Sequence, residues 1–305
     1  MIKNQTLIAT PKVSVLMTCY NAASTIEESV RSVLAQTFTN FELVLVDDLS
    51  SDNSIALIEK IDDPRIRIKK LTTRHRRTKA LNQGFNLCRG EYIAVLDADD
   101  VAEPTRFEKQ IALLDADKKL VGVGTWYIDI DPSKNEISRT AQTTNSREIR
   151  SKLAYENPLP HSSMMYRREL AQTVGGYDEN YDYAQDYALW LALSQFGEFT
   201  VVPEYLTQMR KLPESMTFGR DYSMNSVMDG YSLIRKAQSL TGVRPTHRLK
   251  GICTIGLYGL LYAWRSLRAG KVLRAVGLTI TNFWAIPIAL FELLRKGLKF
   301  FKPIK

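Results

Sequence analysis

A cluster of acidic side chains directly follows an apolar segment in the first third of the chain. Residues 92–96 read Tyr-Ile-Ala-Val-Leu, as expected for a buried strand, and Asp97, Asp99 and Asp100 come immediately afterwards. Open α/β sheets bind their ligands where the strands end. Carboxylate oxygens suit Mg²⁺ or Mn²⁺, which in turn suit a diphosphate. The pattern therefore favours a cation and nucleotide site, with a purely structural acidic cluster as the alternative.

Polar side chains also follow two earlier apolar segments. Thr18, Tyr20 and Asn21 end the segment that starts at residue 13, and Asp47 and Asp48 follow the segment at 41–46. An exposed aromatic ring can stack on a nucleobase, which contributes about 1–3 kcal/mol. The alternatives are a core tyrosine at a strand end and aspartates that only organise a turn.

The elements that would position these residues alternate regularly. Apolar, β-branched segments at 13–18, 41–46, 66–71 and 92–96 indicate strands. Helical patterns fill the intervals, and further strands are expected at 120–130 and 160–166, with a helix at 187–196. This alternation predicts a parallel sheet with helices on both faces.

Several of these segments together resemble family 2 glycosyltransferases of the GT-A fold. The resemblance runs from about residue 12 to about residue 217 and is carried by residues 11–21, 36–38, 46–52 and 97–100 in family order. It implies a Rossmann-like mixed sheet that binds a nucleotide-diphospho-sugar. It also implies inverting transfer of the sugar, usually from a UDP-sugar, with Mn²⁺ or Mg²⁺ as cofactor.

The resemblance assigns roles around the nucleotide. Tyr20 would lie against the uracil, with Thr18 and Asn21 on the same loop. Asp48 would accept the imide N–H that uracil has and cytosine lacks, and Asp97 would face the ribose.

The resemblance also assigns the cation and the charge that it balances. Asp99 would be the direct metal ligand, whereas Asp100 is expected to cap a helix. The ion would neutralise charge growing on the departing diphosphate.

Inversion requires a base on the face opposite the leaving group. Residues 183–190, Tyr-Ala-Gln-Asp-Tyr-Ala-Leu-Trp, resemble the family's Glu-Asp motif, so Asp186 is the expected base. Gln185 replaces the usual glutamate, which could alter acceptor binding. Trp190 lies one helical turn after Asp186 and could wall the acceptor site, although a packed core position is favoured.

Two further residues are candidates for contact with the diphosphate. His161 could donate to it or shape the sugar pocket, or be a satisfied, half-buried histidine. Arg210 resembles a Tyr-Arg-x-His segment, but Met209 and Leu212 replace the tyrosine and the histidine. The basic run at 74–77 either forms a loop near the nucleotide or is a solvated charged surface.

Charge is concentrated at the C-terminal end of the chain. From Arg244 onward there are 12 basic residues and one acidic residue, whereas the preceding residues hold 29 basic and 32 acidic ones. A basic face on the folded domain, as nucleic-acid binding requires, is therefore not expected. Three cysteines without metal-ligand spacing disfavour a zinc site and indicate a reducing compartment.

The C-terminal region has an amphipathic, basic character. Residues 275–291 carry no charge, but about 20 apolar residues are needed to span a bilayer. Lysines and two phenylalanines follow, as in interfacial segments. We expect a GT-A domain at 1–220 and a helical, membrane-associated region at 221–305, peripheral on the cytoplasmic face of the inner membrane. A spanning helix and a helical hairpin packed on protein are the alternatives.

A membrane-facing tail suggests a glycan or polyprenyl-diphosphate-linked acceptor, as in bacterial surface polysaccharide synthesis. Two other functions compete with this interpretation. A nucleotidyltransferase would need a Gly-rich phosphate loop after the first strand, where residues 18–21 read Thr-Cys-Tyr-Asn. A catalytically inactive, membrane-docked nucleotide-sugar-binding protein would not need the full set of Asp48, Asp97, Asp99 and Asp186.

Overall fold

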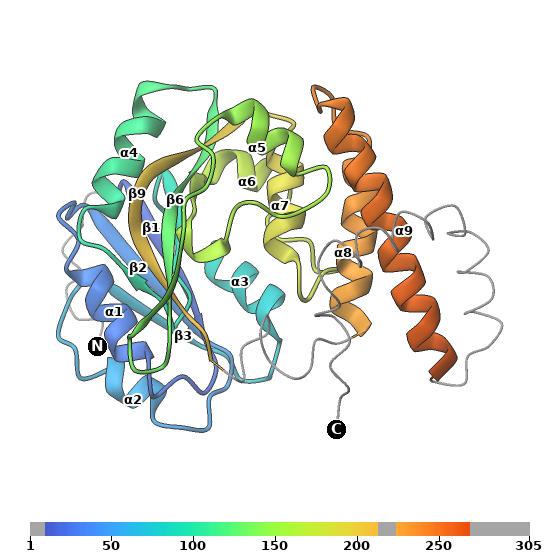
Figure 1. Ribbon diagram of the computed structural model, residues 1–305. Helices are drawn as coiled ribbons and strands as arrows, with labels where there is room; N and C mark the ends of the chain where they lie inside the picture. The colour runs from blue at the N-terminus through green and yellow to red at the C-terminus, as the bar shows by residue number, and fades with distance from the viewer. Residues whose placement is uncertain (1–9, 213–223, 269–305) are drawn as a thin grey trace. The chain divides into compact units, whose positions relative to one another are not determined.

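The computed structural model describes residues 10–212 and 224–268 (Figure 1). These residues belong to two units. One lies within 1–149 and 158–220, and the other lies within 150–157 and 221–305. The first unit holds the mixed sheet and every candidate site residue.

Four parallel strands form one half of the sheet. They are β1 (Val13–Cys19), β2 (Phe41–Asp47), β3 (Ile66–Lys70) and β4 (Tyr92–Val95), in the spatial order β3-β2-β1-β4. Val13 pairs with Phe41 and with Tyr92, so β1, β2 and β4 start level. Because the strands are parallel, the loops that follow them share one edge of the sheet. The predicted parallel core is thereby confirmed.

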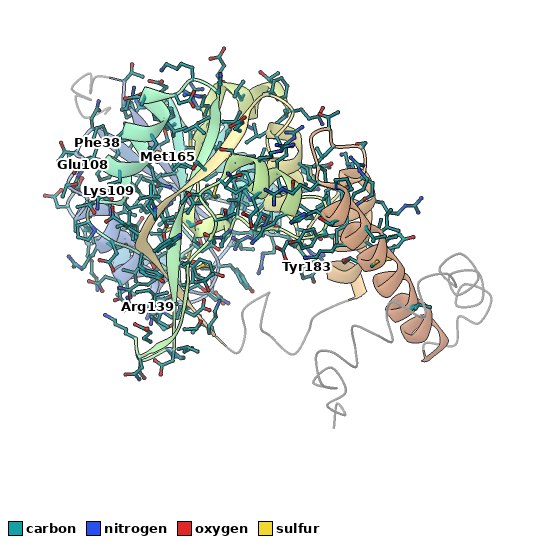
Figure 2. All side chains as sticks on the ribbon, turned by 45° about the horizontal axis from the view of Figure 1, so that its top comes forward. Phe38, Glu108, Lys109, Arg139, Met165 and Tyr183 are labelled. Atoms are coloured by element: carbon teal, nitrogen blue, oxygen red, sulfur yellow. The ribbon has the colours of Figure 1, made fainter. Side chains whose placement is uncertain are left out.

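The other half of the sheet is mixed. Beyond β4 the order continues β8 (Met165–Arg167), β6 (Leu120–Ile130), β9 (Glu198–Arg210) and β5 (Val101–Ala102), and β7 (Glu136–Thr140) pairs with β6. Strand β8 is antiparallel to both neighbours, while β6 and β9 are parallel. Met165 lies within this sheet and is fully buried, whereas Arg139 extends from the β6–β7 ribbon (Figure 2).

Helices cover both faces of the parallel half. Buried residues of α1 (Ile26–Leu34), α2 (Ser54–Ile58) and α4 (Arg106–Ala116) form one apolar core with the strands, and α3 (Arg77–Phe85) packs on β1 and β2. The remaining helices of this part are α5 (Ser146–Lys152), the 3-10 helix at His161–Ser163, α6 (Arg168–Thr173) and α7 (Gln185–Leu193). Burial on both faces explains why β1 and β2 are apolar almost throughout.

One expected strand is shorter than its sequence indicates. Residues 160–166 were expected to be a strand, but the 3-10 helix occupies 161–163 and β8 begins at Met165. Pro158 and Pro160 fix the backbone before this segment and remove two N–H donors. The resulting turn presents His161 and Ser162 toward the end of β4 instead of placing them in the ladder.

The second unit contains two long helices. They are α8 (Met224–Ala237) and α9 (Pro245–Arg268), and the Gln238 amide donates to the Ala154 carbonyl at 2.7 Å within this unit. In the part of the chain that the structure describes, no helix combines the length and apolarity needed to cross a bilayer. The apolar segment at 275–291, for which membrane contact was expected, lies outside the described residues.

A buried carboxylate anchors the start of the parallel sheet. Glu42 on β2 has a side chain only 4% exposed, and it accepts from Ser14 at 2.7 Å and from Arg67 and Arg89, each also at 2.7 Å. Burial alone would raise the pKa of Glu42. Hydrogen bonds from Arg89, Ser14 and Arg67 outweigh it and lower the pKa below its usual range.

We expect Glu42→Gln to reduce the free energy of unfolding by about 2–3 kcal/mol, the value of hydrogen bonds to a charged group. The lowered pKa means that the charged form stabilises the fold above about pH 4.3, and that this contribution disappears as pH falls further. Urea unfolding at pH 7 and pH 4 should therefore show a smaller difference between the variant and the wild type at pH 4.

Glu27→Gln provides the control, because it removes an exposed i,i+4 pair with Arg31 that contributes less than about 1 kcal/mol. Equal losses in the two variants would contradict the anchoring role of Glu42.

Candidate active site

The loops after β1 and β2 are tied to each other. Cys19 pairs with Asp47, so both strands end at the same level. Asn21, in a left-handed conformation with φ 49°, accepts from the Ser51 N–H at 2.8 Å and donates its own N–H to Ser50 Oγ at 3.0 Å. Thr18 is half-buried in β1 opposite Val46. These contacts hold Tyr20 beside the loop that carries Asp48.

Asp48 is a buried carboxylate that organises the segment before α3. Its oxygens accept the backbone N–H of His75 at 2.7 Å, the backbone N–H of Arg76 at 2.9 Å and the Arg74 Nε–H at 2.7 Å. Arg76 has φ 65° and ψ 171°, a conformation that is rare outside glycine. The hydrogen bond from its N–H to Asp48 holds this strained backbone in place. Asp47 instead accepts the Ser50 N–H within its own turn, at 3.1 Å.

Arg74 contacts both residues that the resemblance assigns to the nucleobase, Tyr20 and Asp48. Tyr20 is 46% exposed, and the Arg74 guanidinium carbon lies 3.1 Å from the centre of its ring. Arg74 therefore stacks on Tyr20 while its Nε–H bonds Asp48. A nucleobase was expected to make the same two contacts: to stack on Tyr20 and to donate an N–H to Asp48.

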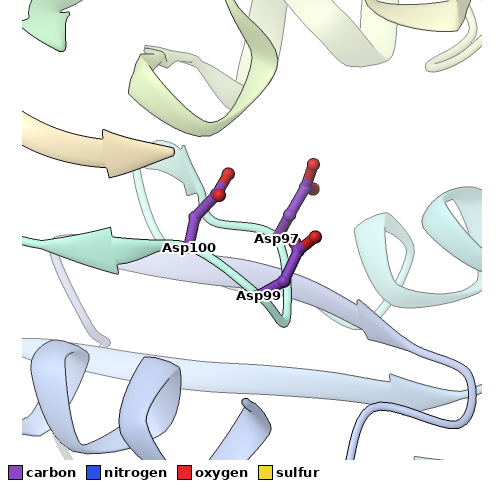
Figure 3. Close-up of side chains that lie close together, drawn as sticks. All are labelled: Asp97, Asp99 and Asp100. Carbon is purple, nitrogen blue, oxygen red and sulfur yellow. The ribbon is translucent and has the colours of Figure 1, made fainter. Parts of the chain in front are cut away.

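The acidic cluster after β4 is compact (Figure 3). One ligand oxygen from each of Asp97, Asp99 and Asp100 lies within 4.8 Å of the others, and all three side chains leave the same turn. Asp100 turns toward the end of β9, where it accepts the Arg210 N–H at 2.8 Å. The Asp97 N–H donates to Ser162 Oγ at 3.1 Å.

The three carboxylates have different electrostatic surroundings. Burial raises the pKa of Asp97, but the charge of Arg77, which also donates hydrogen bonds to it, holds the pKa well below the usual range. Burial and the neighbouring Asp97 raise the pKa of Asp99 to about 6. Burial and the charges of Asp99 and Asp97 also raise the pKa of Asp100. Among the described residues no cation forms an ion pair with the Asp99 carboxylate. The oxygens of the Asp99 carboxylate are hard ligands and therefore suit a divalent ion.

Arg77, the first residue of α3, lies at the centre of the site. Its Nη2 donates to both oxygens of Asp97 at 2.6 Å and lies 3.1 Å from His161 Nδ1. Burial lowers the pKa of Arg77, but attraction by Asp97, Asp99 and Asp186 outweighs it and raises the pKa above its ordinary value. The sequence analysis did not single this arginine out of the run at 74–77, because four adjacent basic residues look alike in sequence.

His161 connects this arginine to two buried tyrosines. Since a guanidinium nitrogen can only donate, the hydrogen bond from Arg77 assigns a lone pair to His161 Nδ1 and the proton to Nε2. Nε2–H then donates to the Tyr177 hydroxyl at 2.9 Å, which lies 3.1 Å from the Tyr166 hydroxyl. His161 Nδ1 also lies 3.4 Å from Asp97 Oδ1, so the imidazole and the carboxylate hold the same guanidinium nitrogen side by side.

The expected base occupies the first turn of α7. Asp186 is half-buried, and its Oδ1 accepts the Tyr187 N–H at 2.7 Å. Carboxylates are stabilised at a helix N-terminus, which favours the ionised form that a base requires. Gln185 is buried beside it. With its amide oxygen toward the arginine, Gln185 accepts from Arg77 Nε at 2.8 Å and donates to the Asp182 carbonyl at 3.2 Å.

Two of the expected contact residues have no surface for a ligand in this structure. Trp190 is fully buried, donates to the Leu159 carbonyl at 3.0 Å and packs edge-on against Tyr166 and Phe199. The Arg210 side chain is 2% exposed. It bonds Glu28 at 2.8 Å and the Asp99 carbonyl at 3.0 Å. Arg210 therefore holds the acidic turn in place from β9.

Together these contacts belong to an α/β domain of the GT-A fold, with the candidate site at the edge where its parallel strands end. Asp48 accepts hydrogen bonds from residues 74–76. Arg77, the next residue, pairs with Asp97 and is attracted electrostatically by Asp186. Acidic residues that follow β2 and β4, and one from the first turn of α7, thus act on one segment, residues 74–77. Carboxylates in this arrangement could hold a diphosphate with its cation and deprotonate a hydroxyl.

Comparison with known proteins assigns the family. The model of "Glycosyl transferase family 2" matches residues 14–175, and the chain belongs to this family of glycosyltransferases. It is 32% identical over 214 residues to the succinoglycan biosynthesis protein ExoO of Rhizobium meliloti, which covers 66% of this chain and 62% of ExoO. It is 29% identical over 187 residues to WfaP of Escherichia coli, named UDP-Glc:alpha-D-GlcNAc-diphosphoundecaprenol beta-1,3-glucosyltransferase, covering 61% and 71%. The matched segment thus spans about two thirds of each relative.

Solved structures agree on the fold. Residues 1–349 of Staphylococcus aureus TarS in complex with UDP-GlcNAc superpose with a TM-score of 0.67 at 18% identity, covering 94% of this chain and 92% of that one. The mannosyltransferase PcManGT of Pyrobaculum calidifontis, with GDP-Man and Mn²⁺, gives a TM-score of 0.61 at 18% identity, covering 96% and 81%. At such identities the likeness concerns the fold.

Proposed function

We propose that this glycosyltransferase moves a sugar from a UDP-sugar, with inversion, to a hydroxyl of a glycan or of a polyprenyl-diphosphate-linked acceptor. The observation that carries the proposal is the gathering of Asp48, Asp97, Asp99 and Asp186 around the segment at 74–77. The name of WfaP states a UDP-glucose donor and a diphosphoundecaprenol acceptor, and TarS was solved with UDP-GlcNAc. Bacterial surface polysaccharide synthesis is the setting that fits such an acceptor.

The base of the donor would occupy the place that Arg74 fills. Uracil stacked on Tyr20 and donating its imide N–H to Asp48 makes the same two contacts as the guanidinium. The Arg74 side chain is 42% exposed, so it can leave without opening the core. The two backbone N–H groups on Asp48 stay in place and keep the carboxylate oriented toward the base.

The acidic turn would hold the ribose and the cation. Asp97, fixed by Arg77, faces the ribose, and Asp99 provides the carboxylate for Mn²⁺ or Mg²⁺. When bound, the ion offsets the negative charge of the diphosphate leaving group. Arg210 donates to the Asp99 carbonyl at 3.0 Å and so holds the backbone from which the carboxylate extends.

Asp186 would act as the base for the acceptor hydroxyl. The N-terminus of α7 and the nearby Arg77 charge both favour its ionised form. The carboxylate takes the hydroxyl proton as the oxygen attacks in line with the departing UDP, through an oxocarbenium-like centre. His161 would orient Arg77 at the diphosphate end of the site.

The donor assignment predicts selective stabilisation by uridine nucleotides. A ligand present at 100 times its Kd stabilises a protein by about 2.7 kcal/mol. We expect UDP with Mn²⁺ to raise the melting temperature more than GDP or CDP does, and Asp48→Asn to reduce the preference over CDP, which lacks the imide N–H. Preference for GDP, or no response to any nucleotide, would contradict the proposed donor, and release of UDP from UDP-glucose or UDP-GlcNAc would then be measured directly.

We also propose that the C-terminal region binds the cytoplasmic surface of the inner membrane. Each basic residue near an anionic surface adds about 1 kcal/mol, and the attraction is screened by salt. The protein should float with vesicles containing phosphatidylglycerol and not with phosphatidylcholine alone. Replacing the last lysines by glutamine should weaken flotation; the positions are Lys296, Lys299, Lys302 and Lys305. Binding that ignores both lipid charge and salt would contradict this docking mode.

A further inference from the structure

Arg77 contacts two elements that serve opposite sides of the proposed reaction. Its Nη2 holds Asp97, at the end of β4, through two 2.6 Å contacts. Its Nε–H donates to Gln185, at the start of α7, at 2.8 Å. Asp97 belongs to the donor side, and Gln185 directly precedes the proposed base.

We propose that Arg77 is a positioning residue that sets Asp97 and the Gln185–Asp186 turn in a fixed relation to each other. The inference rests on the proposed function, since it concerns the same site. The planar guanidinium has donors pointing in several directions, so it can bond a carboxylate and an amide at once. A lysine at this position would have the positive charge but could not make the second, fixed hydrogen bond to Gln185.

The identity of residue 185 follows from this arrangement. Among the described residues Arg77 forms its ion pair with one carboxylate, that of Asp97, and both side chains are about one quarter exposed. A glutamate at 185 would place a second carboxylate on the same guanidinium and compete with Asp97 for it. A glutamine accepts the Nε–H without drawing the charge away. We infer that the glutamine is matched to Arg77.

His161 and Tyr177 keep the arginine from rotating. His161 Nδ1 accepts from Nη2 at 3.1 Å, and Nε2 is bonded to the buried Tyr177 hydroxyl at 2.9 Å. Thr78, the next residue of α3, donates to the Tyr181 carbonyl at 2.7 Å. The first turn of α3 is thus fastened to the loop before α7, and the geometry of both contacts is maintained.

Substitutions at Arg77 and at Gln185 separate the contact with Asp97 from the contact with Gln185. Arg77→Lys keeps the charge beside Asp97 and loses the hydrogen bond to Gln185, while Gln185→Met leaves Arg77 in place and removes the amide that accepts from it and donates to the Asp182 carbonyl. Both should retain UDP affinity within about threefold of wild type and lose at least about tenfold in kcat, because the proposed base is no longer held in position. Arg77→Met should lose both UDP affinity and turnover. Gln185→Glu should weaken UDP binding.

The measurements are calorimetric titration of UDP with Mn²⁺ and the rate of UDP release from the UDP-sugar that the wild type uses. Lys79→Met is the matched control, because it removes an exposed cation two residues further along α3. Circular dichroism and melting curves establish that each variant is folded. If the wild type fails to bind UDP, the donor assignment fails. If the wild type binds UDP but Arg77→Lys restores both affinity and turnover, Arg77 is only a counter-charge and the positioning role is overturned.

Discussion

Asp186→Asn should abolish sugar transfer while the variant still binds UDP. A positioned general base contributes about 10²–10⁴-fold to a rate, and an amide cannot accept the hydroxyl proton. The substitution keeps the size of the side chain and an oxygen that can accept the Tyr187 N–H, so the start of α7 should be unchanged. Steady-state turnover and calorimetric UDP binding, measured on the same preparation, separate the two effects.

Asp178→Asn is the matched control for that substitution. Asp178 lies in the loop before α7 and accepts the Asn180 N–H at 3.0 Å, a contact that asparagine can also make. Its removal takes one negative charge from the same region of the protein. Wild-type turnover in Asp186→Asn would remove the base assignment. Equal losses in the two variants would show that net charge matters and that a proton acceptor at 186 does not.

Much of this site follows from the positions at which strands end. The segments before Asp48 and Asp97 are almost continuously apolar, which is typical of strands in a parallel sheet with both faces covered. Once β2 and β4 are parallel to β1, the residues that follow them must lie at one edge. Asp186 required the resemblance, because a helix of almost uniformly apolar residues gives no sequence signal for the direction of its first turn.

Side-chain partnerships were less accessible from the sequence. The run at 74–77 contains three arginines, which the chain uses differently: Arg74 stacks on Tyr20, Arg76 pairs with Asp182 on the surface, and Arg77 enters the site. Which of them points inward depends on the left-handed backbone at Arg76, and that conformation depends on Asp48, 28 residues earlier. Local pattern does not encode such a long-range contact.

Trp190 and Arg210, both candidates for ligand contact, illustrate the same difference, although a core position was already favoured for Trp190 and the structure has it there. Helical spacing placed Trp190 near Asp186, but a period of 3.6 residues also places it on the face packed against Tyr166 and Phe199. Arg210 lies at the end of β9, where Glu28 and several carbonyls surround its guanidinium. Because Arg210 donates to backbone carbonyls, it organises a turn. Its place in the sequence nevertheless resembles that of an arginine that binds phosphate.

Asp99→Asn should remove the part of UDP binding that depends on Mn²⁺. Asp97 is neutralised by Arg77 and Asp100 is bonded to the Arg210 N–H, so Asp99 is the carboxylate of the turn left to hold the ion. Loss of a residue that supports a metal ligand weakens metal binding roughly 10–100-fold. Loss of the ligand itself should weaken Mn²⁺ binding at least as much. Electron paramagnetic resonance of free Mn²⁺ measures this without turnover.

Asp117→Asn is the control for this substitution, since Asp115-Ala116-Asp117 repeats the Asp-Ala-Asp pattern at the exposed end of α4. It should leave both Mn²⁺ and UDP binding unchanged. Without cation, Asp99→Asn should also raise the melting temperature, because it relieves repulsion between buried carboxylates, whose neighbours raise the pKa of Asp99 to about 6. If Asp99→Asn keeps full Mn²⁺ affinity, the ion binds elsewhere, and the acidic turn serves the fold through Arg77 and Arg210.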